Sequence, residues 1–343
     1  MLAKQWISHC NHDDHICIER YTSEQPHQSE NPTRLLQIDR NARRVRLIQT
    51  IRGERYEYVT LSHRWGHKKT ASTRKENVHS HVHRGIQTLD LPATFRDAVI
   101  VAHTIGYQYL WIDSLCIVQD DTEDWELECP RMASIYQGSV LTIAGTAAID
   151  SHSGLLREQV PDHSSVLQGR GWIFQEGLLS RRTLNFAPGQ MYMVCHQGAR
   201  YETSLYQGVF PHPRWETDFG YYRWWRGTVA KYSSCQFTTI MGRLPALSGI
   251  ANRFKPPEPD QYLAGIWRHD ILRSLLWRRR GKPHSDAPAE YLGPSWSWVS
   301  VPARIEFIYV EDGSTSVSCA SLVSAATVPK ESMPTEELPV ERY

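Results

Sequence analysis

Ionisable side chains follow two short apolar runs of the kind that form buried strands. Asp113 and Cys116 come directly after Tyr109-Leu110-Trp111-Ile112, and His63 follows the run 58–62. An open parallel sheet binds its ligands at the loops that follow the carboxyl ends of its strands, so these positions favour a site. There a carboxylate could act as an acid or base, and Cys116 could act as a nucleophile if His63 takes its proton.

Glu176 supplies a second carboxylate. It lies in a segment, 171–180, whose pattern predicts a helix, and Trp172 stands one turn earlier on the same surface. Burial beside an aromatic wall would favour the protonated carboxyl group, which suits acid–base work. The candidate catalytic residues are therefore Asp113, Cys116, Glu176 and His63.

Three of these residues also have a structural interpretation, which the sequence leaves open. A cysteine in a Leu-Cys-Ile context, as at Cys116, is often a small buried apolar side chain. Asp113 could hold the turn that follows its strand. Glu176 could form a buried ion pair with Arg170 or Arg181, since structural ion pairs perturb titration as active sites do.

Neighbouring side chains complete the candidate pocket. The substrate-binding candidates are Ser62, Arg64, Trp65, Gln119, Trp172 and Gln175. We predict that the loop 62–65, the loop 113–119 and the helix 172–176 converge on one cavity, because two of them follow strands of one sheet.

The N-terminal Cys10, His12, His15 and Cys17 raise the question of zinc. Four ligands within eight residues cannot readily enclose a tetrahedral ion, because structural sites usually bring together two separated pairs. The sequence offers no second Cys/His pair at conventional spacing. We therefore expect no metal, and we expect no cofactor.

Composition limits the function classes. The chain has 343 residues, of which 41% are hydrophobic and 22% charged, as in a globular protein. A formal net charge of +1 is too balanced for a dedicated nucleic-acid binder. No apolar run approaches the roughly 18 residues of a membrane span, and the seven scattered cysteines form no disulfide framework. We expect a cytoplasmic protein without nucleic-acid or membrane partners, which binds a small-molecule ligand or associates with itself.

The sequence lacks the motifs of some common mechanisms. The chain contains no GxGxxG, P-loop or GxSxG motif, so Rossmann-type dinucleotide binding, ATP hydrolysis and the usual esterase mechanism lose their support.

Hydrophobic patterning predicts the elements that position these residues. Strands are expected at 45–49, 56–62, 109–112 and 139–144, and helices at 92–105 and 122–137, the latter interrupted at Pro130. The first two strands would form a hairpin or lie side by side. Alternation of strand and helix predicts an α/β fold with a largely parallel sheet flanked by helices.

The second half of the chain is expected to mix helices and strands. A hairpin is predicted from 183–186 and 190–195, aromatic helices over 221–254 and 261–280, and strands at 295–299 and 305–310. The expected domains are an irregular lead-in over 1–40, an α/β domain over 41–200, a C-terminal region packed on it over 201–320, and a tail over 321–343.

Three ordered segments resemble successive blocks of the fungal heterokaryon-incompatibility (HET) domain. They are Tyr58-Val59-Thr60-Leu61-Ser62-His63-Arg64-Trp65-Gly66, Leu91-Pro92-Ala93-Thr94-Phe95-Arg96-Asp97-Ala98 and Trp111-Ile112-Asp113-Ser114-Leu115-Cys116-Ile117-Val118-Gln119-Asp120. Later segments at 132–136, 154–155 and 170–176 are similar to further blocks, and 244–251, 264–267 and 294–298 resemble a C-terminal region that many such proteins carry.

The resemblance implies a function as well as a fold. The HET domain is thought to be distantly similar to the TIR domain and acts in nonself recognition that ends in cell death. Some TIR relatives cleave NAD by means of a glutamate. The first hypothesis is therefore a cell-death effector with TIR-like NAD cleavage. The alternative is a free-standing enzyme, with acid–base or cysteine-dependent chemistry, recruited to the biosynthesis of a small molecule such as a secondary metabolite.

Overall fold

The structure, a computed structural model, describes residues 2–13, 17, 31–66, 70–156, 171–202, 207–208, 218–237, 242–281, 291–308, 322 and 324. The chain divides into two compact units. The first comprises Met1–Gln168 and Gln175–His212, and the second comprises Gly169–Phe174 and Pro213–Tyr343. The expected tail over 321–343 lies outside the described residues apart from 322 and 324.

A mixed sheet forms the centre of the first unit. Its strand order is β10-β9-β8-β7-β6-β3-β5-β1-β2-β4. The strands are β1 (Arg34–Ile38), β2 (Arg44–Gln49), β3 (Tyr58–Ser62), β4 (Ile86–Gln87), β5 (Tyr109–Trp111), β6 (Leu141–Ala144), β7 (Arg182–Ala187), β8 (Gln190–Cys195), β9 (Gly198–Tyr201) and β10 (Gln207–Gly208). β3 pairs in parallel with β5 and β6, and β6 with β7, whereas the pairs outside this centre are antiparallel. The prediction of an α/β fold is confirmed.

The pairing of the second strand differs from the prediction. β2 pairs with β1 and β4, while β3 lies between β5 and β6, so the expected neighbourhood of β2 and β3 is wrong. The burial of the two strands explains this. β2 alternates buried and exposed residues, which is typical of an outer antiparallel strand, whereas every residue of β3 is buried, which is typical of a central parallel strand.

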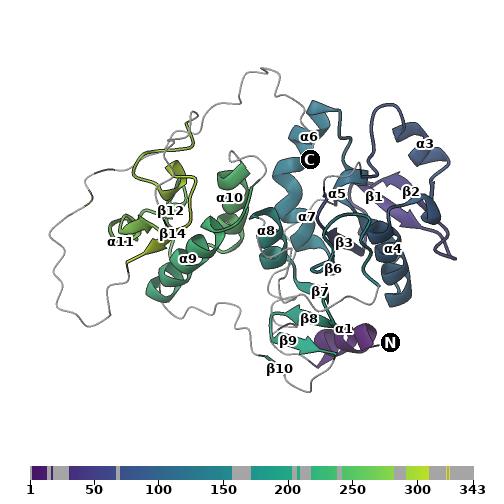
Figure 1. Ribbon diagram of the computed structural model, residues 1–343, viewed down its shortest axis with the longest axis horizontal. Coiled ribbons are helices and arrows are strands. Elements are labelled where there is room, and N and C mark those ends of the chain that lie inside the picture. Colours follow the sequence, from purple (N-terminus) through teal and green to yellow (C-terminus); the bar gives the residue numbers. More distant parts are fainter. Residues whose placement is uncertain are drawn as a thin grey trace. The chain divides into compact units, whose positions relative to one another are not determined.

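Helices flank the central strands (Figure 1). They are α1 (Leu2–His12), α3 (Val78–His83), α4 (Ala93–Ile105), α5 (Asp113–Cys116), α6 (Thr122–Glu128), α7 (Met132–Gly138) and α8 (Gly171–Leu179), with 3-10 turns at Thr88–Asp90 and Cys129–Arg131. α4 confirms its prediction and ends at Gly106, whose φ of 102° is the left-handed conformation of a helix C-cap. The predicted interruption at Pro130 is also confirmed, because a 3-10 turn separates α6 from α7.

The N-terminal segment begins with a helix instead of the expected irregular lead-in. Ala3, Trp6, Ile7 and Cys10 are buried, and their spacing of three and four residues forms one helical face. Figure 1 shows α1 beside β8 and β9 at one edge of the sheet, and α1 contacts β8. The periodicity was therefore present in the sequence, and the polar histidines between the apolar residues obscured it.

The described part of the second unit is helical, with one small hairpin and one antiparallel pair of distant strands. It contains α9 (Asp218–Ser233), α10 (Arg243–Arg253) and α11 (Ile271–Ser274), a 3-10 turn at Trp298–Ser300, and the pairs β11 (Tyr262–Leu263) with β12 (Ile266–Trp267) and β13 (Trp277–Arg279) with β14 (Ile305–Phe307). Burial of Trp225, Trp298, Tyr221 and Tyr232 forms an aromatic core.

Two predictions for this unit are wrong. A single helix over 261–280 does not form, because Ala264 and Gly265 have φ angles of 44° and 97° and turn the chain into a hairpin. A Cβ atom at Gly265 would lie 2.6 Å from Nε1 of Trp298, so this close approach requires glycine. The segment 295–299 ends in a 3-10 turn and not in a strand, whereas the strand expected at 305–310 is present as β14.

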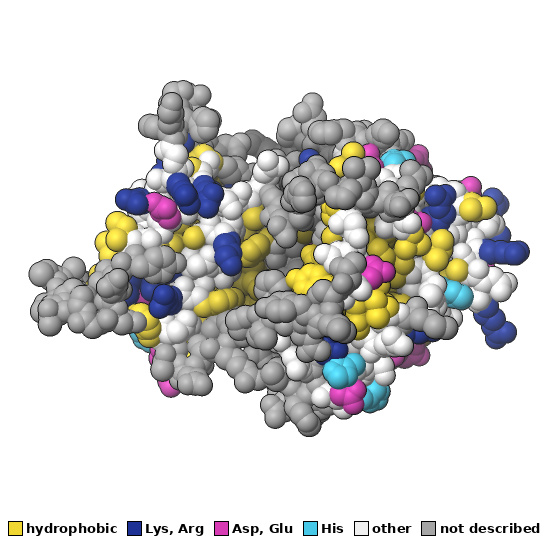
Figure 2. Space-filling model, turned by 60° about the horizontal axis from the view of Figure 1, so that its bottom comes forward, with side chains coloured by type: hydrophobic (Ala, Val, Ile, Leu, Met, Phe, Trp, Pro, Cys, Tyr) yellow, Lys and Arg dark blue, Asp and Glu magenta, His cyan; other side chains and the backbone are white. Residues whose placement is uncertain are grey.

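The surface agrees with the balanced charge of the sequence. On the face drawn in Figure 2, the Lys and Arg side chains of the described residues are dispersed among other types and form no continuous basic patch. None of the described helices combines the length and apolar character that crossing a membrane requires.

Candidate functional site

The parallel strands of the first unit bring several of the predicted residues to one edge of the sheet. β3 pairs with β5 through Thr60 and Trp111, and with β6 through Ser62 and Ala144. Because parallel strands end at the same edge, the loops after β3, β5 and β6 are neighbours there. The structure thus places the loops 62–65 and 113–119 together.

A direct hydrogen bond joins the first two loops. Nε1 of Trp65 donates a hydrogen bond to Oδ2 of Asp113 at 2.8 Å, while Oδ1 of Asp113 accepts one from the backbone N–H of Ser114 at 2.7 Å. Gln119 donates from Nε2 to the carbonyl oxygen of Asp113 at 3.1 Å. Both carboxylate oxygens of Asp113 are therefore held at the start of the short helix α5.

Tyr136, from α7, connects Glu176 to this edge. Its single hydroxyl proton has two acceptors within reach, the side chain of Glu176 and, at 3.2 Å, the carbonyl oxygen of Leu61, the residue before the end of β3. Burial, then the carboxylates of Glu176 and Asp113 and the hydrogen bond with Glu176, raise the pKa of Tyr136 well above its usual range. Asp113, Tyr136 and Glu176 thus form one electrostatically connected group, which we call the carboxylate–tyrosine cluster.

Glu176 is buried within this cluster, with 7% of its surface exposed. It belongs to the part of α8 that lies in the first unit, as does the buried Gln175. Arg170, one of the two ion-pair partners considered for Glu176, lies outside the described residues. Trp172 belongs to α8, but its side chain is not among the described parts of the structure.

The surroundings of Cys116 favour its structural interpretation. The residue is 1% exposed, and burial raises the pKa of its thiol to about 12. Its carbonyl oxygen accepts a hydrogen bond from Nε of Arg34 at 2.7 Å, which fixes the end of α5 against β1. A thiol that is buried and protonated at neutral pH is a poor nucleophile.

His63 is also buried, and it packs against α4. Its ring meets the ring of Phe95 edge-on, with 4.8 Å between the ring centroids. Ser62 is buried at the end of β3, where its carbonyl oxygen accepts the N–H of Gly145, while Arg64 is half-buried. These contacts place Ser62, His63 and Arg64 at the predicted edge. The cavity expected between the three segments stays a prediction.

The loop after β6 completes this edge of the sheet. Ser151 donates from its hydroxyl group to the carbonyl oxygen of Trp65 at 3.0 Å. Gly66 has a φ of 78°, and a Cβ atom there would lie 2.3 Å from that of Asp150, so the close approach of the two loops requires glycine. The buried Asp97 of α4 accepts the N–H groups of Leu155 and Leu156 at 2.7 and 3.1 Å.

Sequence reasoning missed two parts of this site. The sequence predicts Tyr136 only as part of the helix 122–137 and of a family-like block, although its position in the helix before β6 indicates a side chain that can reach the central strands. Asp97 was not considered, yet a carboxylate on the helix face that carries Ala98 and Val101 predicts a buried partner.

The positions of three cysteines differ from the expectation that no group of metal ligands forms. Cys10 and Cys17 lie close to Cys195, at the end of β8, and the three sulfur atoms are all within 4.8 Å of one another. The sequence argument against a metal depended on the compact spacing of Cys10 and Cys17. It did not include a third cysteine brought in by the sheet.

The fold and the carboxylate–tyrosine cluster define an α/β protein with polar side chains at the carboxyl edge of its central parallel strands. Residues 58–168 match the family model described as heterokaryon incompatibility protein (HET). This part of the chain thus matches the HET domain, and the resemblance seen in the sequence is confirmed. The matched range includes Asp113 and Tyr136 and ends before Glu176. Comparisons with curated proteins and with solved structures found no match, and the likeness to the TIR domain stays a prediction.

Proposed function

We propose that this HET-domain protein is an effector of nonself recognition that ends in cell death, and that the carboxylate–tyrosine cluster is its acid–base site. The HET match supports the biological role. The observation that carries the chemistry is the hydrogen bond between Tyr136 and the buried Glu176, with the Asp113 carboxylate close enough to act on the same tyrosine.

The reaction we propose is TIR-like hydrolysis of NAD. Water adds to the ribose carbon that bears nicotinamide, the bond to the nicotinamide nitrogen breaks, and the products are nicotinamide, ADP-ribose and one proton. Glu176 would accept the proton of the attacking water or face the positive charge that develops on the ribose. Tyr136 would position Glu176, and Asp113 would hold the loop after β5 through Trp65.

The test measures nicotinamide released when the purified full chain is incubated with NAD. We expect release by the natural protein and its loss in Glu176→Gln, which keeps the volume and removes the charge. Glu128→Gln is the matched control. Glu128 is also buried, but its carboxylate pairs with Arg131 at a distance of 2.8 Å and not with a member of the carboxylate–tyrosine cluster. Its folded fraction should retain full activity.

Two outcomes would contradict the proposal. One is a folded natural protein that releases no nicotinamide and that does not kill when it is expressed in a fungal cell. The other is consumption of a different small molecule in metabolite profiles while NAD stays constant, which would favour the biosynthetic enzyme.

A further inference from the structure

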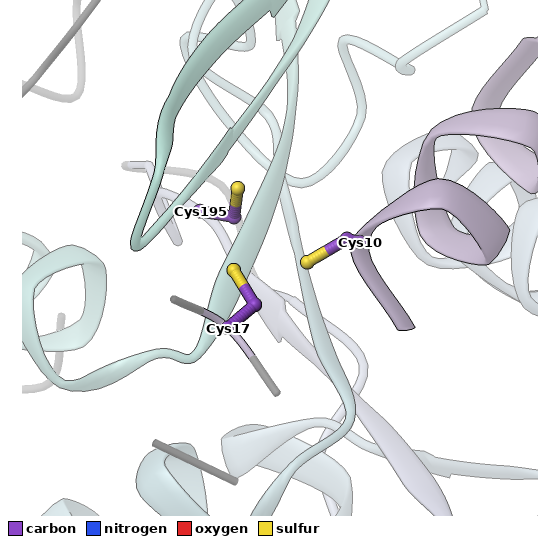
Figure 3. Close-up of side chains that lie close together, drawn as sticks. All are labelled: Cys10, Cys17 and Cys195. Carbon is purple, nitrogen blue, oxygen red and sulfur yellow. The ribbon is translucent and has the colours of Figure 1, made fainter. Parts of the chain in front are cut away.

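Three cysteines from distant parts of the sequence meet in the first unit. Cys10 lies in the last turns of α1, Cys17 follows it after a short connection, and Cys195 ends β8. Their sulfur atoms lie within 4.8 Å of one another, and Figure 3 shows the three side chains close together. All three residues are buried, with 0, 0 and 3% of their surfaces exposed.

The spacing of the sulfur atoms fits a thiophilic cation. Zinc–sulfur bonds of about 2.3 Å in a tetrahedral site place the sulfur atoms roughly 3.8 Å apart. The upper limit of 4.8 Å therefore requires a contraction of only about 1 Å when an ion enters. A disulfide would join two of the sulfur atoms and leave the third unused, so it does not account for a cluster of three.

The groups around the sulfur atoms are those that stabilise thiolates. Nε of the buried Arg182 donates a hydrogen bond to Sγ of Cys10 at a distance of 3.2 Å. Sγ of Cys195 accepts the backbone N–H groups of Gln197 and Gly198, in the turn that leads into β9. Positive charge and N–H donors around ligating sulfur atoms are the usual outer contacts of a metal site, because they offset the negative charge of the thiolates.

Among the described residues, the group of atoms within 4.8 Å of one another holds the three cysteines and no histidine, so the fourth ligand is a water molecule or a histidine whose side chain turns toward the ion. His12 ends α1, two residues after Cys10, and the buried His196 follows Cys195 directly. Three thiolates and one imidazole form one of the usual structural zinc sites.

We propose that Cys10, Cys17 and Cys195 bind one Zn²⁺ ion, which fastens α1 to the β8–β9 hairpin. α1 contacts the sheet through β8, and Arg182 of β7 donates hydrogen bonds to Cys10 and Asn11 of this helix. An ion bound to both elements would add to the contacts that hold the short N-terminal helix. This inference does not depend on the proposed function, because the cysteines lie outside the carboxylate–tyrosine cluster.

Metal analysis of the full chain, purified without chelators, provides the first test. We expect about one zinc ion per chain in the natural protein and its loss in Cys195→Ser. Cys129→Ser is the matched control, since Cys129 belongs to the same unit, is half-buried and is not one of the three cysteines that lie together. It should retain the ion.

A titration with Co²⁺ keeps the test decisive if Cys195→Ser does not fold. The natural protein, stripped of metal, should develop the thiolate-to-cobalt absorption band, and added Zn²⁺ should abolish the band. Zn²⁺ should also raise the melting temperature of the stripped protein by roughly 5–10 °C when it is in large excess over its dissociation constant. The proposal is overturned if the natural protein contains no zinc, shows no such band and melts at the same temperature with or without Zn²⁺. A Cys10–Cys17 disulfide in protein free of metal would overturn it equally.

Discussion

Nε1 of Trp65 and Oδ2 of Asp113 are 2.8 Å apart and join the loops after β3 and β5 at one edge of the sheet. The two residues are 48 positions apart in the chain, and both belong to the range that matches the HET family. This bond, together with the contact between Tyr136 and Glu176, is what makes the loops one site and not separate turns.

Replacing either partner of this bond should destabilise the first unit. We expect Trp65→Phe and Asp113→Ala each to lower the free energy of unfolding, with a coupling energy of about 1 kcal/mol in the double variant, because each removes the same hydrogen bond. Urea unfolding of the two single variants and the double variant measures this coupling. Fully additive effects would mean that the bond contributes nothing to stability.

Substitution of Asp97 should lower the free energy of unfolding more than substitution of Asp113. Its carboxylate is buried and accepts two backbone N–H groups, so Asp97→Ala leaves both donors without their acceptor. We expect a loss of about 3 kcal/mol in the free energy of unfolding. Asp97→Asn should lose less, since its amide oxygen still accepts. Equal losses in the two variants would argue that packing, and not hydrogen bonding, is what Asp97 supplies.

The variant Cys116→Ser distinguishes a structural role of the buried Cys116 thiol from a role as nucleophile. The substitution places a more polar hydroxyl group in an apolar site, so we expect a loss of about 1–3 kcal/mol in the free energy of unfolding. The activity of the folded fraction should be unchanged. Abolished activity in a protein of unchanged stability would assign Cys116 a catalytic role.

Alkaline pH should unfold the protein. Burial raises the pKa values of Tyr58, Tyr136, Tyr221, Tyr232 and Tyr262 above the ordinary 10.0. The folded chain then keeps protons that the unfolded chain loses, so this contribution to stability is complete below pH 10 and is lost as the pH rises from there towards the raised values.

Each such tyrosine should remove about 1.4 kcal/mol per pH unit in this range. Thermal unfolding between about pH 8 and about pH 11, with tyrosinate absorbance as a second signal, measures the effect. Tyrosinate should form together with unfolding. Full ionisation of all tyrosines in a chain that remains folded would contradict the burial of these residues.

The local elements of the first unit could be predicted because their patterns are strong. α4 has its apolar face and Gly106 at its end, and β5 and β6 are short apolar runs between polar turns. The pairing of β2 could not be predicted in the same way. Periodicity identifies a strand, whereas the choice of neighbour depends on which faces the rest of the chain covers.

The residues of the candidate site show the same difference between local and long-range features. Asp113, His63 and Glu176 were predicted because strand ends and helix faces are local features. The part played by Tyr136 and the meeting of Cys195 with Cys10 depend on contacts across 40 to 185 positions of the chain, which local spacing does not contain. The hairpin at Ala264 and Gly265 was missed because its apolar flanks also fit a helix.

The release of nicotinamide from NAD by Glu176→Gln, compared with the natural protein, tests the central claim most directly. Removal of the acid–base group should lower the rate by about 10²–10⁴-fold, while the melting temperature stays within a few degrees, because the substituted glutamine side chain can still hydrogen-bond with Tyr136. A folded Glu176→Gln protein with the natural rate, or one whose loss of activity only follows its loss of folded structure, would contradict the account.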